Sequence, residues 1–351
     1  MIQRRISKQV QVGNIKIGGD APISVQSMTN TDTRDVKSTL KQIYNLAETG
    51  CEIIRLAVLN SDATEAIRKI KKSSPLPIVS DIHFDYRLAL KCIENGVDAL
   101  RINPGNIGKE ENVRKVVSLA KANNIPIRIG INGGSLEKDL EIMQIPLAEK
   151  MVISALRHIK ILEDNNFDKI VISLKSSDVL TTIEAYRLMA QKVDYPLHLG
   201  VTEAGTFTGG IIKSSVGIGT LLAEGIGDTI RVSLTDSPIE EVKAGYSILK
   251  ALGLRKRGIN FVSCPTCGRT QINLIELAKE VEKRLESFDK PLTIAVMGCA
   301  VNGPGEAKHA DYGIAGGINE GYIFKKGEII KRLPEEKLVD EFINIIQTEN
   351  M

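Results

Sequence analysis

Hydrophobic positions in the first two-thirds of the chain follow two alternating periods. Short apolar runs predict buried strands. Between the runs, apolar residues recur every three or four positions, as at Val113, Val116, Val117 and Ala120, which predicts amphipathic helices. The predicted strands lie at 23–28, 53–58, 78–83, 99–103, 127–132, 170–175, 197–202 and 230–235.

Eight consecutive strand–helix units are typical of a (β/α)8 TIM barrel, an α/β fold with an inner ring of parallel strands. The alternative is an open doubly wound sheet, which is weakened because no glycine fingerprint for dinucleotides follows the first strand. The segment 1–20 has short apolar stretches on either side of Gly13 and Asn14, which predict a hairpin that closes the lower end of the barrel. We expect the barrel domain to span 1–255.

The last third of the chain, 256–351, predicts a second domain with its own core. A short stretch rich in glycine and arginine at 253–258 follows the eighth helix and indicates a linker. Apolar faces at 274–285 and 338–346 predict two helices. Strands are expected at 292–296, 312–315, 322–324 and 328–330. The expected fold is therefore a small α+β domain.

Charged residues occupy strand positions that a barrel normally fills with Val, Ile and Leu. Side chains two residues apart lie on the same face of a strand, so Arg101 shares a face with Asn103, and Arg128 shares one with Asn132. Five cations recur in this way along the predicted strands, namely Arg55, Arg101, Arg128, Lys175 and Arg231.

These cations have two interpretations. They can point outward and pair with helix carboxylates, or they can converge inside the barrel, where they repel one another unless an anion or a carboxylate neutralises them. Their repetition favours the inward placement and predicts a diphosphate-sized anion at the C-terminal mouth of the strands. At the same ends, Glu203 is a candidate proton carrier or ion-pair partner, and a scaffold role is the default for His83.

Composition narrows the possible functions. The 46 basic and 43 acidic residues leave a formal charge of +3, which argues against a general polyanion binder, and the lack of tryptophan argues against stacking platforms for nucleic acid. No window is apolar and long enough to span a membrane, and no apolar run follows the N-terminal positive charges as in a secretory signal. Five cysteines in such a chain indicate reduced thiols or metal ligands, and a cytoplasmic protein.

Three cysteines in the second domain have the spacing of metal ligands. Cys264 and Cys267 are separated by two residues, Cys299 follows an apolar run, and Glu306 is the natural fourth ligand, with His309 second. The second Cys-x-x-Cys of a zinc ribbon is missing, so a cluster with one replaceable ligand is favoured, while structural zinc stays open. A thioredoxin-type dithiol formed by Cys264 and Cys267 is less favoured, because it would leave Cys299 without a role.

Long motifs in both domains then identify a resemblance. They are Ser-Cys-Pro-Thr-Cys-Gly-Arg at 263–269, Met-Gly-Cys-Ala-Val-Asn-Gly-Pro-Gly-Glu-Ala at 297–307 and Ala-Asp-Tyr-Gly-Ile-Ala-Gly-Gly at 310–317, with further similarity at 27–31, 101–106 and 200–205. Together they resemble the bacterial 4-hydroxy-3-methylbut-2-en-1-yl diphosphate synthases over essentially the whole chain. The likeness is to the compact two-domain form, without the inserted domain of plant-type members.

That resemblance implies a function and a set of site residues. The implied reaction is reductive ring opening and dehydration of 2-C-methyl-D-erythritol 2,4-cyclodiphosphate in the non-mevalonate isoprenoid pathway. Electrons would come from reduced flavodoxin or ferredoxin through a [4Fe–4S] cluster. The implied cluster ligands are Cys264, Cys267, Cys299 and an exchangeable Glu306, with Asn302 beside the cluster. The implied diphosphate ligands are Arg55, Arg101, Arg128 and Lys175, with Asn132 and His83 nearby and Glu203 as proton donor. Strand parity adds Arg231 to the substrate-binding set.

Chain topology predicts a shared site. The helices of such a barrel run back from the mouth, so the eighth helix brings the second domain to the opposite end. A helix of about fifteen residues spans roughly 22 Å, which the short linker cannot easily recover. We therefore expect a head-to-tail homodimer in which each cluster domain caps the barrel of the other subunit.

Two other functions remain as alternatives at this stage. One is a phosphate-ligand-binding barrel with a structural zinc domain. The other is a redox-inert transferase of the pterin-binding barrel kind, whose substrates also carry diphosphate.

Overall fold

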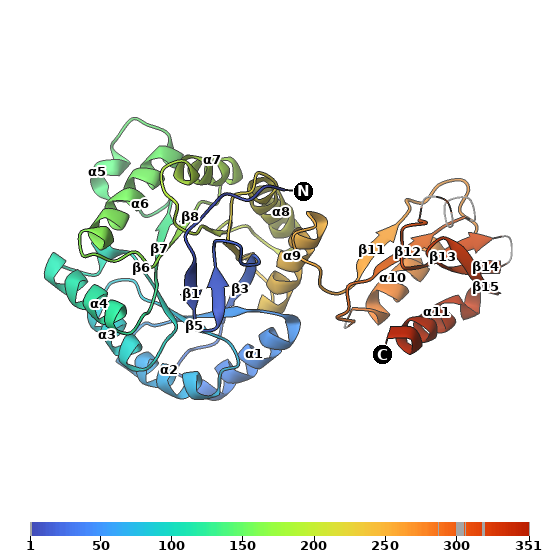
Figure 1. Cartoon of the computed structure of the whole chain (residues 1–351), viewed down its shortest axis with the longest axis horizontal. Helices are drawn as coiled ribbons and strands as arrows, with labels where there is room; N and C mark the ends of the chain where they lie inside the picture. The colour runs from blue at the N-terminus through green and yellow to red at the C-terminus, as the bar shows by residue number, and fades with distance from the viewer. Residues whose placement is uncertain (1, 287, 300–304, 306, 318–319, 351) are drawn as a thin grey trace. The chain divides into compact units, whose positions relative to one another are not determined.

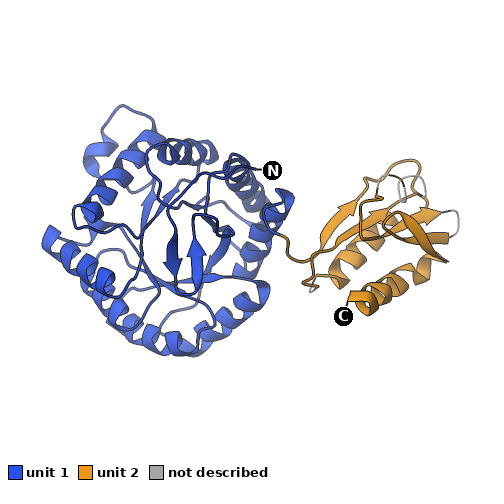
Figure 2. Cartoon of the chain, viewed as in Figure 1, with its two compact units in different colours: residues 1–255 blue, residues 256–351 orange. Residues whose placement is uncertain are grey.

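The computed structural model describes residues 2–286, 288–299, 305, 307–317 and 320–350. The chain divides into two compact units, Met1–Arg255 and Lys256–Met351 (Figure 2). Each unit has a hydrophobic core of its own. Two residues of the expected site, Asn302 and Glu306, lie outside the described residues.

Unit 1 is a nearly closed barrel of eight parallel strands with helices around it, which confirms the predicted TIM barrel (Figure 1). The sheet order is β8-β7-β6-β5-β4-β3-β10-β9, and a bridge between Ile172 and Leu197 joins β8 to β9. The barrel strands are β3 (Ser24–Met28), β4 (Ile53–Ala57), β5 (Ile78–Asp81), β6 (Ala99–Ile102), β7 (Ile127–Asn132), β8 (Ile170–Lys175), β9 (His198–Leu199) and β10 (Thr229–Ile230).

Several of the surrounding helices begin where an Asp or Asn side chain caps the first turn. Asp35 accepts a hydrogen bond from the Ser38 amide, and Asn60 accepts one from the Ala63 amide, which satisfies amides that the first turn leaves free. The helices are α1 (Val36–Thr49), α2 (Ser61–Ser73), α3 (Tyr86–Glu94), α4 (Glu110–Ala122), α6 (Leu147–Glu163), α7 (Val179–Ala190), α8 (Phe207–Ala223) and α9 (Pro238–Ala251). Two short elements lie in the loops at the mouth, the 3-10 turn η1 (Pro104–Asn106) and α5 (Lys138–Glu141).

Side-chain alternation gives each barrel strand two environments. On β4, Ile54 and Leu56 belong to the large core between strands and helices, while Ile53 belongs to a separate cluster inside the barrel. That inner cluster includes Val12 and Ile17 from a hairpin formed by β1 (Val10–Val12) and β2 (Ile15–Ile17). An apolar plug therefore fills the closed end of the barrel, and the interior toward the mouth is left to polar residues.

Unit 2 is a five-stranded sheet with two helices, of the small α+β kind (Figure 1). The first two strand pairs are parallel and the last two are antiparallel. Its elements are β11 (Asn260–Ser263), α10 (Leu274–Arg284), β12 (Thr293–Met297), β13 (Tyr312–Gly317), β14 (Glu320–Lys325), β15 (Glu328–Leu333) and α11 (Glu335–Asn350).

Some strand boundaries differ from the sequence prediction. The seventh and eighth barrel strands are shorter than expected, because the chain leaves the ladder soon after Leu199 and Ile230 and continues as loops of the mouth. Strand β11 was not predicted, since it is an edge strand whose residues are mostly exposed and carry little apolar pattern. Among the described residues, no helix is long and apolar enough to cross a membrane.

A buried carboxylate ties the N-terminal segment to the barrel. Asp228 is 3% exposed and precedes β10. It accepts hydrogen bonds from the Ser7 hydroxyl at 2.8 Å, the Leu197 amide at 2.9 Å and the Arg4 guanidinium at 3.1 Å. Asp228 thus joins the N-terminal segment to the chain just before β9 and just before β10. These two strands are the shortest of the barrel, with two residues each.

We predict that Asp228→Ala lowers the free energy of unfolding by about 3 kcal/mol or more, because it leaves buried donors without an acceptor. The control is Asp194→Ala, which removes an exposed ion pair with Lys8 (3.5 Å) and should cost less than about 1 kcal/mol. Urea unfolding followed by circular dichroism measures both. Equal losses in the two variants would show that Asp228 has no special role in closing the barrel.

Candidate active site

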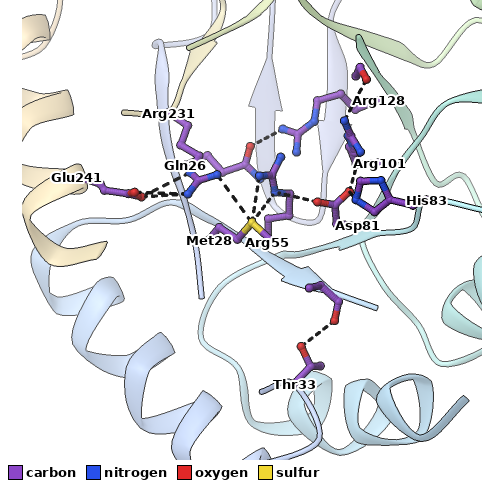
Figure 3. Close-up of polar contacts among 12 residues, drawn as sticks. Gln26, Met28, Thr33, Arg55, Asp81, His83, Arg101, Arg128, Arg231 and Glu241 are labelled. Atoms are coloured by element: carbon purple, nitrogen blue, oxygen red, sulfur yellow. Dashed lines mark hydrogen bonds and ion pairs between the residues drawn. The ribbon is translucent and has the colours of Figure 1, made fainter. Parts of the chain in front are cut away.

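Four of the predicted cations, Arg55, Arg101, Arg128 and Arg231, lie inside the barrel (Figure 3), and Lys175 is also buried there. Asp81, at the end of β5, lies between two of them, with Arg101 at 3.2 Å and Arg55 at 3.5 Å from its carboxylate oxygens. Burial by itself would raise the pKa of Asp81, yet the two arginines hold that pKa below its ordinary value. Asp81 is therefore ionised and neutralises part of this cluster.

Two glycines make room for the cationic side chains. A Cβ at Gly130 would lie 2.4 Å from Nε of Arg101, whose Nη2 donates to the Gly130 carbonyl at 3.0 Å. A Cβ at Gly200, just after β9, would lie 2.8 Å from both the Arg231 carbonyl oxygen and Nζ of Lys175. A larger residue at either glycine would therefore displace the neighbouring cation, and at Gly200 it would also meet the backbone.

Arg231 pairs with a carboxylate from a helix. Its Nη2 lies 3.4 Å from Oε1 of Glu241, which α9 contributes and which is 4% exposed. Glu241 also accepts from the Leu234 amide at 3.0 Å and the Ser27 hydroxyl at 3.2 Å. An ion pair with a helix carboxylate is what an outward-pointing arginine would form. The Arg231–Glu241 pair is of this kind, but it is buried at the barrel wall.

Arg128 lies deeper and has a neutral partner. Its Nη1 donates to Oε1 of Gln26, whereas among the described residues its Nε and Nη2 have no hydrogen-bond partner. It lines a small cavity together with Val12 and Ile17, near the plugged end. Burial, followed by the nearby Arg55, lowers the pKa of Arg128 well below its ordinary value.

Lys175, at the end of β8, is a buried cation without a counter-charge. It is 7% exposed, and no carboxylate of the described residues lies within ion-pair distance. Burial lowers the pKa of Lys175 well below its ordinary value of 10.5, and the neighbouring arginines lower it further.

The charges inside the barrel do not balance. Five cations face two carboxylates, Asp81 and Glu241, in a setting that excludes water. Unpaired buried charge is costly, and a bound multivalent anion would remove that cost. The geometry therefore fits an anion of at least two charges at the mouth side of the barrel.

The other predicted residues of unit 1 lie around this cluster with less direct contact. His83 lies beyond β5, half-exposed, with Nε2 at 3.7 Å from Asp81. Asn132 ends β7 directly across from Lys175. Glu203 is exposed in the loop after β9, with φ of +51°. A non-glycine residue in this left-handed region lowers the stability of the fold by roughly 1 kcal/mol. Backbone strain of this kind is typical of functional sites.

Three members of the cluster were missed by the sequence reasoning. Gln26 and Met28 share the inward face of β3, and the same two-residue alternation that identified the arginines could have found them. Glu241 could not be found in this way, because a helix residue reaches the barrel wall only through tertiary packing.

In unit 2, two of the three candidate thiols follow neighbouring parallel strands. Ser263 of β11 lies opposite Val296 of β12, and the two strands are parallel. Cys264 and Cys299 therefore follow the strands at the same edge of the sheet, the one formed by the carboxyl ends of β11 and β12. The Cys264 sulfur accepts a hydrogen bond from the Gly298 amide at 3.2 Å. This topology brings the two cysteine segments together, as metal ligation requires.

Cys267 differs from the buried cysteines of unit 1 in exposure and in the pKa of its thiol. It is exposed, and the backbone N–H and side chain of Arg269 lower the pKa of its thiol. By contrast, burial raises the pKa of Cys51 to about 12, as expected for an inert core thiol.

The full ligand set is not assembled within the part of the chain that the structure describes. No group of three or more Cys, His, Asp or Glu residues there is placed to hold a metal ion, and Glu306 falls outside those residues. The donor chemistry of three thiols, two of them at one sheet edge, nevertheless fits an iron–sulfur cluster.

Comparison with known families covers nearly the whole chain. The GcpE TIM-barrel domain matches residues 7–246, and the GcpE protein C-terminal domain matches residues 260–348. A protein of Clostridium perfringens, 4-hydroxy-3-methylbut-2-en-1-yl diphosphate synthase (flavodoxin), is 62% identical over 99% of this chain and 100% of its own length. A protein of the same name from Geobacter sulfurreducens is 60% identical over 96% of both chains.

Two solved structures of similar fold cover about 70% of this chain. A dihydropteroate synthase from Xanthomonas albilineans has a TM-score of 0.51 at 12% identity and covers 70% of this chain and 99% of its own. A dihydropteroate synthase from Coxiella burnetii has a TM-score of 0.50 at 13% identity and covers 70% of this chain and 97% of its own. At this level of identity the likeness shows the fold and nothing about the substrate.

We predict that Lys175→Met raises the free energy of unfolding by about 2 kcal/mol when no anion is bound, because it removes a buried unpaired charge. The pKa of Lys175 is lower in the folded state than in the unfolded state. The loss of stability caused by its buried charge is therefore fully present below the lowered pKa and disappears as the pH rises toward about 10.5. The gain should therefore shrink with increasing pH.

Urea unfolding at several pH values checks this, with Lys213→Met, at an exposed lysine of α8, as the control. A stability gain for Lys175→Met no larger than that of the control at low pH would contradict the claim that Lys175 is an unpaired buried cation.

Proposed function

The chain belongs to the GcpE family, and we infer that it catalyses the reductive conversion of 2-C-methyl-D-erythritol 2,4-cyclodiphosphate to (E)-4-hydroxy-3-methylbut-2-enyl diphosphate. Relatives with about 60% identity over nearly their full length carry that activity in their names. The chain is therefore an oxidoreductase of isoprenoid biosynthesis. The alternatives of a zinc-bearing sensor and a pterin-type transferase are not favoured.

The unbalanced positive charge of the barrel is the observation that carries the substrate assignment. A cyclic diphosphate presents two phosphates, each with one negative charge, close together. We propose that Arg55, Arg101 and Lys175 bind these phosphates, together with Arg128 and Arg231. His83 and Asn132 lie at the edge of this group and would complete the contacts.

Proton delivery is assigned to Glu203. The reaction releases water from the substrate, so the departing oxygen needs a proton. Glu203 lies on the mouth side of the barrel, and its left-handed backbone indicates that the position is under constraint. We propose that its carboxyl group donates that proton.

The redox centre is assigned to unit 2. We propose that Cys264, Cys267 and Cys299 hold a [4Fe–4S] cluster, with Glu306 as an exchangeable fourth ligand and Asn302 beside it. When bound, the cluster would supply electrons to the substrate and a Lewis-acid site. The support is the shared sheet edge of Cys264 and Cys299 and the lowered thiol pKa of Cys267.

The electron donor is a separate protein. The relatives are named for flavodoxin, which we propose as the donor here, with ferredoxin as a second candidate. We also propose a cytoplasmic location, because thiolate ligands need a compartment that keeps cysteines reduced.

A homodimer with shared sites is also proposed. Arg255, the last residue of unit 1, donates to the Ile23 carbonyl at 2.8 Å and pairs with Glu52 at 3.1 Å. Ile23 and Glu52 directly precede β3 and β4, so the chain leaves unit 1 at the end of the barrel opposite its mouth. This exit supports the arrangement in which unit 2 of one copy serves the barrel of another.

We predict that anaerobically purified protein contains iron and acid-labile sulfide in nearly equal amounts, about four of each per chain. Cys299→Ser should lose most of both. The matched control Cys92→Ala, at a core thiol whose pKa burial raises to about 12, should keep them. Protein that contains zinc in place of iron would overturn the proposed centre.

We predict that mixing Cys299→Ala subunits with Glu203→Ala subunits under exchange conditions restores part of the activity. In a mixed dimer, one of the two sites would combine an intact barrel with an intact cluster. Each variant exchanged with itself is the control. If the mixture stays as inactive as the controls, the sites are not shared between subunits.

A further inference from the structure

The sulfur of Met28 is in contact with two arginines of the barrel (Figure 3). Arg55 donates to it from Nε at 3.1 Å and from Nη2 at 3.0 Å, and Arg231 directs Nη1 to it at 3.7 Å. Strand order explains this convergence, since β3 lies between β4 and β10. Met28 is the last residue of β3 and lies opposite Arg55, while Arg231 directly follows β10.

A thioether is an unusual partner for two guanidinium groups. It carries no charge and accepts hydrogen bonds weakly, so it neutralises neither cation. The carboxylates of the cluster contact the same arginines: Asp81 lies 3.5 Å from Nε of Arg55, the atom that also donates to the sulfur, and Glu241 lies 3.4 Å from Nη2 of Arg231. Among the described residues, the acceptor that Arg55 and Arg231 share is therefore the neutral sulfur of Met28.

Other side chains of similar size would act differently here. A leucine would offer no acceptor, so the guanidinium groups of Arg55 and Arg231 would repel each other and move apart. A glutamate would bind both arginines strongly and would compete with an incoming anion. A weak neutral acceptor can hold the N–H groups in place and release them to a stronger acceptor.

We propose that Met28 is a positioning residue, whose sulfur holds Arg55 and Arg231 side by side as a clamp for one phosphate of the substrate. This inference rests on the proposed function, since it assumes that the barrel binds a diphosphate. Phosphate oxygens take over the arginine N–H groups when the substrate binds, and the sulfur takes them back when the product leaves.

The test compares two substitutions that differ in hydrogen bonding. Met28→Leu keeps the apolar bulk and removes the acceptor, whereas Met28→Gln removes the thioether and supplies a neutral side-chain oxygen. Binding of inorganic pyrophosphate to the full-length holoenzyme is measured by titration calorimetry. Met143→Leu, at an exposed methionine, is the matched control.

We expect Met28→Leu to raise the Kd for pyrophosphate about tenfold, as the loss of neutral hydrogen bonds to both arginines implies. Met28→Gln should stay within about threefold of the unmodified protein. In steady-state kinetics, Met28→Leu should raise KM while kcat and the visible absorbance of the holoenzyme change little.

Two results would overturn the role of Met28 and leave the proposed function standing. One is equal weakening by Met28→Leu and Met28→Gln, which would mean that the residue only fills space. The other is an unchanged Kd for Met28→Leu. If the unmodified protein does not bind pyrophosphate, both the clamp and the assignment of the barrel as the diphosphate site fail.

Discussion

An excess of buried positive charge is the constraint on which the rest of this structure depends. Three of the five cations inside the barrel contact two carboxylates, while Arg128 pairs with neutral Gln26 and Lys175 has no carboxylate partner among the described residues. Such an arrangement is unfavourable for folding unless an anion binds. The cost explains several neighbouring features, including the glycines at position 130 on β7 and position 200 just after β9, and the neutral acceptors Gln26 and Met28.

The fold keeps this charged interior separate from the parts that stabilise the chain. Apolar faces of the strands pack against the helices, and the N-terminal hairpin plugs the closed end. The mouth is therefore free to be polar. Unit 2 has its own core, and its parallel pair β11 and β12 delivers two cysteine segments to one sheet edge. The proposed substrate site and the proposed redox centre thus belong to separately folded units.

The sequence predicted much of this through simple periodicities. Alternating strand and helix patterns identify the barrel, and the two-residue alternation favours an interior position for Arg55 and Arg101, where the structure has them. The same rule, applied to β3, would have added Gln26 and Met28. Glu241 was beyond its reach because helix orientation depends on packing. Strand β11 was missed because an exposed edge strand has little hydrophobic pattern, and the role of Glu306 rests on resemblance, since that residue lies outside the described structure.

Calorimetric titration of 2-C-methyl-D-erythritol 2,4-cyclodiphosphate into the protein, in two buffers of different ionisation enthalpy at mildly alkaline pH, tests the central claim most directly. Each phosphate of this substrate carries one ester bond and one anhydride bond, so its single acidic group does not titrate near neutrality and any exchanged proton comes from the protein. Burial lowers the pKa of Lys175, and a bound anion should raise it again. We expect binding to take up protons. Binding without proton uptake would show that Lys175 is already charged in the free protein. No binding, or release of protons on binding, would contradict the view that this barrel is built around an unbalanced cationic cluster.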